Sequence, residues 1–221
     1  MFFRFFIIMK SAPPPPKRQR AVQARAKKTQ EKIIERALEL FATNGFDGVS
    51  IREIEIKAKV KRGLVAYHFG SKNDLWCRVM DALFARIPPP PEDDPNLNKA
   101  QKLRIQIKHF VRFSADNPEL SRVILQEGKV QTWRSTYLLD NFVRPRVTLI
   151  QHLFGSFDAH SHYIVIGAAT LVFDVSAECQ ALFGINPYDD AFVDAHADRV
   201  TDLILGINAA FAKQLEIETN E

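Results

Sequence analysis

Apolar residues recur three and four positions apart along most of this 221-residue chain, which is the spacing of one face of an α-helix. The first stripe runs from Ile33 to Phe41 and ends at Asn44-Gly45, a pair typical of a helix C-terminus. No sustained alternation of apolar and polar residues occurs, so strands are not expected. The chain is therefore predicted to be all-α, with eight to ten helices.

Helix starts are marked by side chains that can accept hydrogen bonds from backbone N–H groups. Such capping pairs are Ser50 with Glu53, Ser71 with Asp74, and Asn98 with Gln101. A short helix is expected between the first two starts, from about Lys61 to Phe69. Asn117-Pro118 begins a further helix. A long helix from about Thr132 is expected to be disturbed at Pro145.

Two proline runs, Pro13–Pro16 and Pro88–Pro91, interrupt the helical pattern. We expect residues 1–26 to form a disordered, basic and proline-rich arm, with Met9 as the working start. Its basic residues, which continue to Lys28, suit contact with nucleic-acid phosphates. The apolar residues 1–9 and 164–173 are both shorter than the roughly 20 residues that span a bilayer. No membrane partner is expected, and 164–173 is predicted to be a buried or interface helix.

Charge is distributed unevenly along the chain. Residues 10–87 contain 17 Lys and Arg against 8 Asp and Glu, a net charge of +9, whereas residues 88–221 contain 12 against 18, a net charge of −6. A basic front third beside an acidic remainder is typical of a nucleic-acid-binding head on a separate body. Two solvated faces that differ by chance would give the same count.

Several functional classes are disfavoured by missing motifs. The only cysteines, Cys77 and Cys179, are far apart, which argues against a disulfide framework or a zinc ribbon and fits a cytoplasmic protein. His160-x-His162 lacks the neighbouring ligands of a metal site, and no catalytic triad, phosphate loop or metalloprotease motif is present. We therefore expect no enzyme activity, no metal and no cofactor.

The stretch from Thr29 to Leu83 resembles the DNA-binding head of the TetR/AcrR family of transcriptional regulators. The matching residues are Ile33-Ile34, Ala37 to Phe41, Gly45-Phe46, Val49 to Ile54, Ala58, Val60, Gly63, Tyr67 to Phe69, Ser71-Lys72 and Leu75. Three residues depart from the family pattern: Glu55 replaces a small alanine, Lys59 a turn glycine, and Lys61 the serine that caps the recognition helix. Lys59 is expected to adopt a positive φ or to change the turn, and the cap hydrogen bond at Lys61 is expected to be lost.

The resemblance implies a helix-turn-helix domain over residues 27–73 and an effector-binding and dimerisation domain over 74–221. Arg62 is the expected base reader, because a guanidinium can pair with two acceptors of guanine. Gly63 allows close approach, Leu64 is a candidate for contact with a thymine methyl, and Tyr67 and His68 are expected to contact phosphates. The remaining expected DNA contacts, which are basic residues and residues at helix N-termini, are Ser50, Arg52, Lys61 and Lys72. We expect Phe69 to be part of the core.

In the body, the resemblance implies a cavity for a small, largely hydrophobic or aromatic effector. The candidate pocket residues are His109, Phe110, Phe113, Arg122, Glu127, Trp133, Tyr137, Phe142 and Phe173. A homodimer is expected to read a palindromic operator in double-stranded DNA through two recognition helices. The candidate dimer-interface residues, spaced on the last two helices, are Val172, Val193, Ala197, Val200, Ile204, Ile207 and Phe211.

The leading hypothesis is therefore a one-component transcriptional regulator, which by resemblance is a repressor, that a small effector releases from DNA. An alternative is an all-α interaction module whose helix-turn-helix has degenerated, as Glu55 and Lys59 would suggest. A third is an enzyme built in the helical body. Binding to DNA upstream of the chain's own gene separates the first two hypotheses, and turnover of a cavity ligand tests the third.

Overall fold

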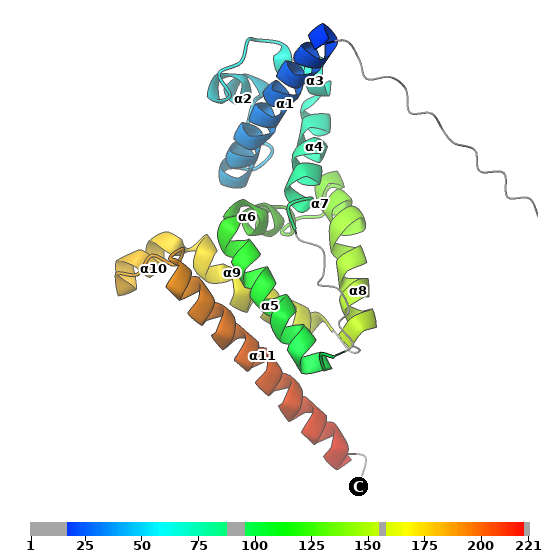
Figure 1. Ribbon diagram of the computed structural model, residues 1–221, viewed down its shortest axis with the longest axis vertical. Helices are drawn as coiled ribbons and strands as arrows, with labels where there is room; N and C mark the ends of the chain where they lie inside the picture. The colour runs from blue at the N-terminus through cyan, green and yellow to red at the C-terminus, as the bar shows by residue number, and fades with distance from the viewer. Residues whose placement is uncertain (1–16, 88–95, 155–157, 219–221) are drawn as a thin grey trace, which may run out of the picture.

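The computed structural model describes residues 17–87, 96–154 and 158–218, and these ranges contain helices and no strand, which confirms the all-α prediction. The upper part of Figure 1 is formed by α1 (Lys17–Asn44), α2 (Ile51–Lys57), α3 (Leu64–Phe69) and α4 (Lys72–Phe84). The lower part contains α5 (Lys99–Asp116), α6 (Pro118–Glu127), α7 (Trp133–Leu138), the π-helix η1 (Leu139–Val143), α8 (Arg144–Phe154), α9 (Ala159–Asp174), α10 (Ser176–Phe183) and α11 (Asp190–Glu218).

The head, α1 to α4, is held together by a core of fully buried side chains. Ile33, Ala37 and Phe41 of α1 pack with Ile54 of α2 and Trp76 of α4. The same core continues into α6 and α7, so the head rests directly on the body. Helix α4 leaves the head and descends beside α7 and α8 (Figure 1), and it therefore connects the two parts.

Most of the predicted helix ends are confirmed. The capping boxes at Ser50, Ser71 and Asn98 all form, and Pro118 begins α6 at its first turn. Gly45 has a φ of 69°, the left-handed conformation expected for the residue after Asn44. These signals lie within a few residues of each other along the chain, so their hydrogen bonds depend little on tertiary packing.

The start of α1 differs from the prediction. The helix begins at Lys17, so the expectation of a disordered arm is wrong for residues 17–26, whereas residues 1–16 lie outside the described part. From Lys17 to Lys28 the sequence has no glycine or proline after Pro16 and is rich in Ala, Arg, Lys and Gln, which are strong helix formers. The basic side chains Arg25, Lys27 and Lys28 are exposed on this extension.

The long helix predicted from Thr132 is present as α7, η1 and α8, which follow one another without a break. Its disturbance is the π-helical turn η1, in which the Arg144 N–H donates to the Leu139 carbonyl five residues earlier. Pro145 has no N–H and cannot make the usual bond to the Asn141 carbonyl, which accounts for the widened turn just before it.

The second core lies between α5, α9 and α11. Val193, Ala197, Val200 and Ile204 of α11 are buried there with Phe173. Their assignment to a dimer interface is therefore wrong, because helical spacing identifies a buried face without identifying what covers it. Val172 is half-buried against the same core, and Ile207 and Phe211 lie outside the residues whose side chains are described.

Within the described ranges, no single helix is both long and apolar enough to cross a membrane. Helices α9 and α10 meet that length and composition only when taken together, and the chain bends by 70° between them.

Candidate nucleic-acid interface

The turn between α2 and α3 has an unusual backbone conformation. Lys59 has a φ of 51°, which confirms the positive φ expected where the family pattern has glycine. The turn is closed by hydrogen bonds from the Lys59 N–H to the Ile56 carbonyl and from the Val60 N–H to the Glu55 carbonyl. Lysine is strained in this region by about 1 kcal/mol or more, so packing on both sides must maintain the turn.

Glu55 supports the N-terminus of α3 from a neighbouring element. Its side chain is buried, and its Oε1 accepts a 2.6 Å hydrogen bond from the N–H of Gly63, the N-cap residue just before α3. Arg52 lies 3.7 Å away and balances the carboxylate. The loss of a serine cap at Lys61 is therefore offset by a carboxylate from α2. From sequence, Glu55 seemed only to disturb packing, because its partner lies eight residues away beyond a turn.

Helix α3 presents two different faces. Val65 is fully buried and Phe69 is half-buried against the head core, as expected for Phe69, while Leu64 is half-buried. Tyr67 is 80% exposed, so it is not a core residue. The exposed residues of α2, the turn and α3 include Arg52 of α2, Lys61, Arg62 and Gly63 of the turn, and Tyr67 of α3. This basic and aromatic surface is suited to a DNA groove and its phosphates.

His68 is held from α1. Its ring is half-buried, with Nδ1 3.5 Å from Nε2 of Gln30, and it meets the Tyr67 ring edge-on with 5.0 Å between centroids. Gln30 thus fixes the imidazole beside the exposed tyrosine. A contact between His68 and phosphate stays a prediction.

The N-termini of α2 and α4 are occupied by their own capping boxes. Hydrogen bonds from the backbone and side chain of Ser50 hold the pKa of Glu53 below its ordinary value, and those from the side chain and backbone of Ser71 do the same for Asp74. Both carboxylates are therefore ionised at neutral pH, and their stabilising effect is lost as pH falls through the lowered pKa values. Any phosphate at Lys72 must use the amides outside this box or the Lys72 ammonium.

The Lys72 ammonium lies 4.2 Å from the centroid of the Phe46 ring. On the same ring, the Arg134 guanidinium lies 4.5 Å from the centroid, and Trp133 packs edge-on. Phe46 belongs to the turn after α1, whereas Arg134 and Trp133 belong to α7. The start of α4 and the body therefore share one aromatic side chain.

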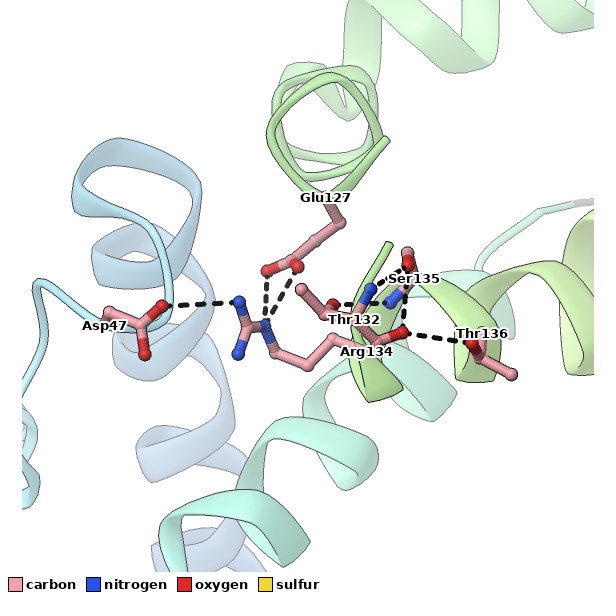
Figure 2. Close-up of polar contacts among 6 residues, drawn as sticks. All are labelled: Asp47, Glu127, Thr132, Arg134, Ser135 and Thr136. Carbon is pink, nitrogen blue, oxygen red and sulfur yellow. Dashed lines mark hydrogen bonds and ion pairs between the residues drawn. The ribbon is translucent and has the colours of Figure 1, made fainter. Parts of the chain in front are cut away.

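Figure 2 shows a polar contact that joins the head to the body, which we call the Arg134 clasp: Arg134, Glu127 and Asp47. The Arg134 Nε lies 2.9 Å from both carboxylate oxygens of Glu127 on α6, and Nη2 lies 3.4 Å from Oδ2 of Asp47 after α1. The side chains of Arg134 and Glu127 are only 12% and 8% exposed. The clasp is a nearly buried ion pair that bridges three elements.

The residues predicted to surround an effector are divided between the two cores, although Tyr137 and Phe142 meet edge-on with 5.9 Å between their ring centroids. Glu127 holds Arg134, Trp133 packs against Phe46 and Trp76, and the Tyr137 hydroxyl donates to Asp81 at 2.6 Å. Phe113 lies in the head-side core, whereas Phe110 and Phe173 lie at the second core. His109 is exposed on α5, and Arg122 is half-buried on α6. Of the nine, Phe142 alone lines the cavity at the foot of α4. The nine residues therefore do not line one pocket in this structure, because they divide between two cores, and their role in effector binding stays a prediction.

Comparison with known proteins agrees with this geometry. Residues 33–77 match the family model described as bacterial regulatory proteins, tetR family. The HTH-type transcriptional repressor Rv3405c of Mycobacterium tuberculosis is 42% identical over 55 residues, which cover 25% of this chain and 29% of that protein. The A-factor receptor protein of Streptomyces griseus is 38% identical over 61 residues, 28% of this chain and 22% of that protein. The chain thus matches less than a third of the length of these relatives.

A solved structure extends the likeness beyond the head. A TetR-like transcriptional regulator from Rhodococcus sp. RHA1 is 21% identical, with a TM-score of 0.60, and the alignment covers 82% of this chain and 96% of that one. At this identity the comparison shows the fold alone: a helix-turn-helix head on a helical body.

Proposed function

We propose that this chain is a one-component transcriptional regulator, because residues 33–77 match the model of the tetR family of bacterial regulatory proteins. The observation that carries the proposal is the exposed surface of α3 and the turn before it, where Arg62 of the turn and Tyr67 of α3 face solvent while Val65 of α3 is buried. Such a helix is held rigidly on one side and is free to enter a major groove on the other. We expect no catalytic activity.

We further propose that the chain acts as a repressor and that a small effector releases it from DNA. One relative is named a repressor and another a receptor, and the body of this chain contains a cavity that α4 shares with the head. A ligand that binds one orientation of α4 better than another would change the fraction of molecules whose head is oriented to bind DNA.

A homodimer is proposed as well, through a surface other than the one predicted from the sequence. We define the outer apolar set as the exposed apolar side chains of α9, α10 and α11 and the turn before α11: Ile164, Leu171, Val175, Leu182, Phe183, Ile185 and Leu203. These helices lie together on one side of the body (Figure 1). An exposed apolar surface of this kind marks an interaction site, and a two-fold pair of heads would read a palindromic operator.

We expect Arg62→Ala to weaken operator binding by about 1–3 kcal/mol and to relax preference at one base position. The physical reason is the loss of two directed hydrogen bonds to guanine. Fluorescence anisotropy on operator variants and on random DNA measures the effect. Lys61→Ala is the control, because an exposed lysine on phosphate should weaken both DNAs equally. If Arg62→Ala also weakened both equally, Arg62 would be a phosphate contact.

A mobility-shift titration with DNA from upstream of the chain's own gene separates the regulator from the alternative, an interaction module with a degenerate helix-turn-helix. A regulator gives a sequence-preferring complex whose affinity falls steeply with salt. The finding that Glu55 and Lys59 are accommodated in an ordered turn favours the regulator.

A further inference from the structure

A surface cavity of about 410 Å³, largely open to solvent, lies at the foot of α4, between that helix, η1 and α8. Its lining residues are Asp81, Phe84, Ala85, Asn141, Phe142, Pro145, Arg146 and Leu149. The volume is within the range of about 300–1,000 Å³ that is usual for small-molecule sites. Because α4 begins in the head at Lys72 and ends here at Phe84, the cavity and the DNA-facing surface share one helix.

The cavity wall is mainly apolar and partly flat. Phe84 and Phe142 stack with their ring centroids 4.1 Å apart and an interplanar angle of 11°. Leu149 and Pro145 extend the apolar lining along α8. Flat aromatic walls favour a planar ligand that can stack on them.

Arg146 is the unusual group in this lining. Its guanidinium is half-buried, and burial lowers its pKa from the ordinary value, although an arginine remains charged at neutral pH. Four other body arginines pair with acids: Arg104 with Asp198 and Asp202, Arg112 with Asp190 and Asp194, Arg134 with Glu127, and Arg144 with Asp140. Among the described residues, Arg146 has only the Phe84 ring, 5.9 Å from its guanidinium carbon.

The other polar groups of the lining, Asp81 and Asn141, do not form an ion pair with the Arg146 guanidinium. Asp81 also lines the cavity, but its carboxylate accepts from the Tyr137 hydroxyl at 2.6 Å and lies 3.9 Å from Arg78. The Asn141 side-chain amide donates to the Tyr137 carbonyl at 2.9 Å and has a second N–H to offer. A partly desolvated cation beside an apolar wall favours an anion that brings its own apolar surface.

We propose that this cavity binds a small aromatic carboxylate, whose ring packs against the Phe84 and Phe142 pair and whose carboxylate accepts hydrogen bonds from Arg146 and Asn141. The inference rests on the proposed function, because it names the chemical class of the effector. It moves the effector site from the nine dispersed residues to one place at the junction of α4 and η1.

The position of the site connects it to the Arg134 clasp. Asn141 and Phe142 belong to η1, which directly follows α7, and α7 carries Arg134. A π-helical turn contains one residue more than the α-helical turn it replaces and is often found at functional sites. A ligand that tightens or displaces η1 would rotate α7 and so act on the clasp that holds the head.

The test is binding of 1-naphthoate, measured by isothermal titration calorimetry, with neutral 1-naphthamide as the matched ligand without charge. We expect the acid to bind at least about tenfold more tightly than the amide, and Arg146→Met to remove that preference. Arg144→Met is the control variant, because that neighbouring arginine is exposed and already paired with Asp140, and it should bind like the unmodified chain. Circular dichroism before each titration shows that the variants are folded.

Equal binding of acid and amide, no binding of the acid, or undiminished acid binding by Arg146→Met would overturn the proposal. Operator affinity, measured in parallel with and without 1-naphthoate, separates the two levels of inference. If the acid binds through Arg146 but operator affinity does not change, the site stands and effector release fails. If the chain binds no operator while the calorimetric result holds, the site again stands and the regulator function fails.

Discussion

Arg134→Met is expected to lower the free energy of unfolding by about 3–5 kcal/mol, the usual cost of leaving one member of a buried ion pair alone. Glu127 would remain in a site where its side chain is 8% exposed, without the guanidinium that now contacts both of its oxygens. The substitution also removes the cation above the Phe46 ring. Urea-induced unfolding, followed by circular dichroism, measures the change.

Two variants isolate the cause. The double variant Arg134→Met, Glu127→Met should recover most of the stability, because an apolar pair of similar volume often replaces a buried ion pair without loss. Arg144→Met, which breaks an exposed pair with Asp140, should cost no more than about 0.5 kcal/mol. A loss below about 1 kcal/mol for Arg134→Met would show that water already screens the clasp.

Leu171→Glu combined with Leu203→Glu is expected to convert a dimer into a folded monomer and to weaken operator binding by about 100-fold or more. Both leucines are more than half exposed in the single chain, at 57% and 51%, so the charges face solvent in the monomer but would be buried in the proposed interface. A monomer has one recognition helix and loses the contacts of the second half-site. Analytical ultracentrifugation and anisotropy with operator DNA measure the two effects.

The matched control is Leu125→Glu with Val130→Glu, which places two charges on exposed apolar residues of α6 and the turn after it. This variant should sediment and bind DNA like the unmodified chain. An unmodified chain that sediments as a monomer at micromolar concentration would contradict the proposed dimer. So would a Leu171→Glu, Leu203→Glu variant that remains dimeric.

The head could be predicted well from sequence because its signals are local. Ser50 with Glu53 and Asn44 with Gly45 each specify a helix end within a few residues, and the structure contains both. The strained turn at Lys59 was also predicted, since the missing glycine leaves a lysine in a conformation that favours glycine. The compensating hydrogen bond from the Gly63 N–H to the Glu55 carboxylate was not predicted, because it depends on how α2 and α3 pack.

The body was harder to predict because its contacts are distant in sequence. Val200 and Ile204 have the spacing of an apolar face, but that pattern is the same whether α5 or a second chain covers it. The Arg134 clasp joins Asp47, Glu127 and Arg134, whose charges look like ordinary surface residues in the sequence. Phe142, Arg146 and Leu149 of the cavity lining are spaced to lie on one helical face, and this spacing can be read from the sequence. The spacing does not show that the face lines a cavity.

The central claim is that the exposed face of α3 reads DNA sequence. The most direct measurement is the ratio of affinities for upstream DNA and for a shuffled duplex of the same length, taken over a range of salt concentrations. The account predicts a ratio of about 10³ or more at physiological salt, and affinities for both duplexes that fall as salt rises. A ratio near one for every duplex tiled across the upstream region, or affinities that do not depend on salt, would contradict it.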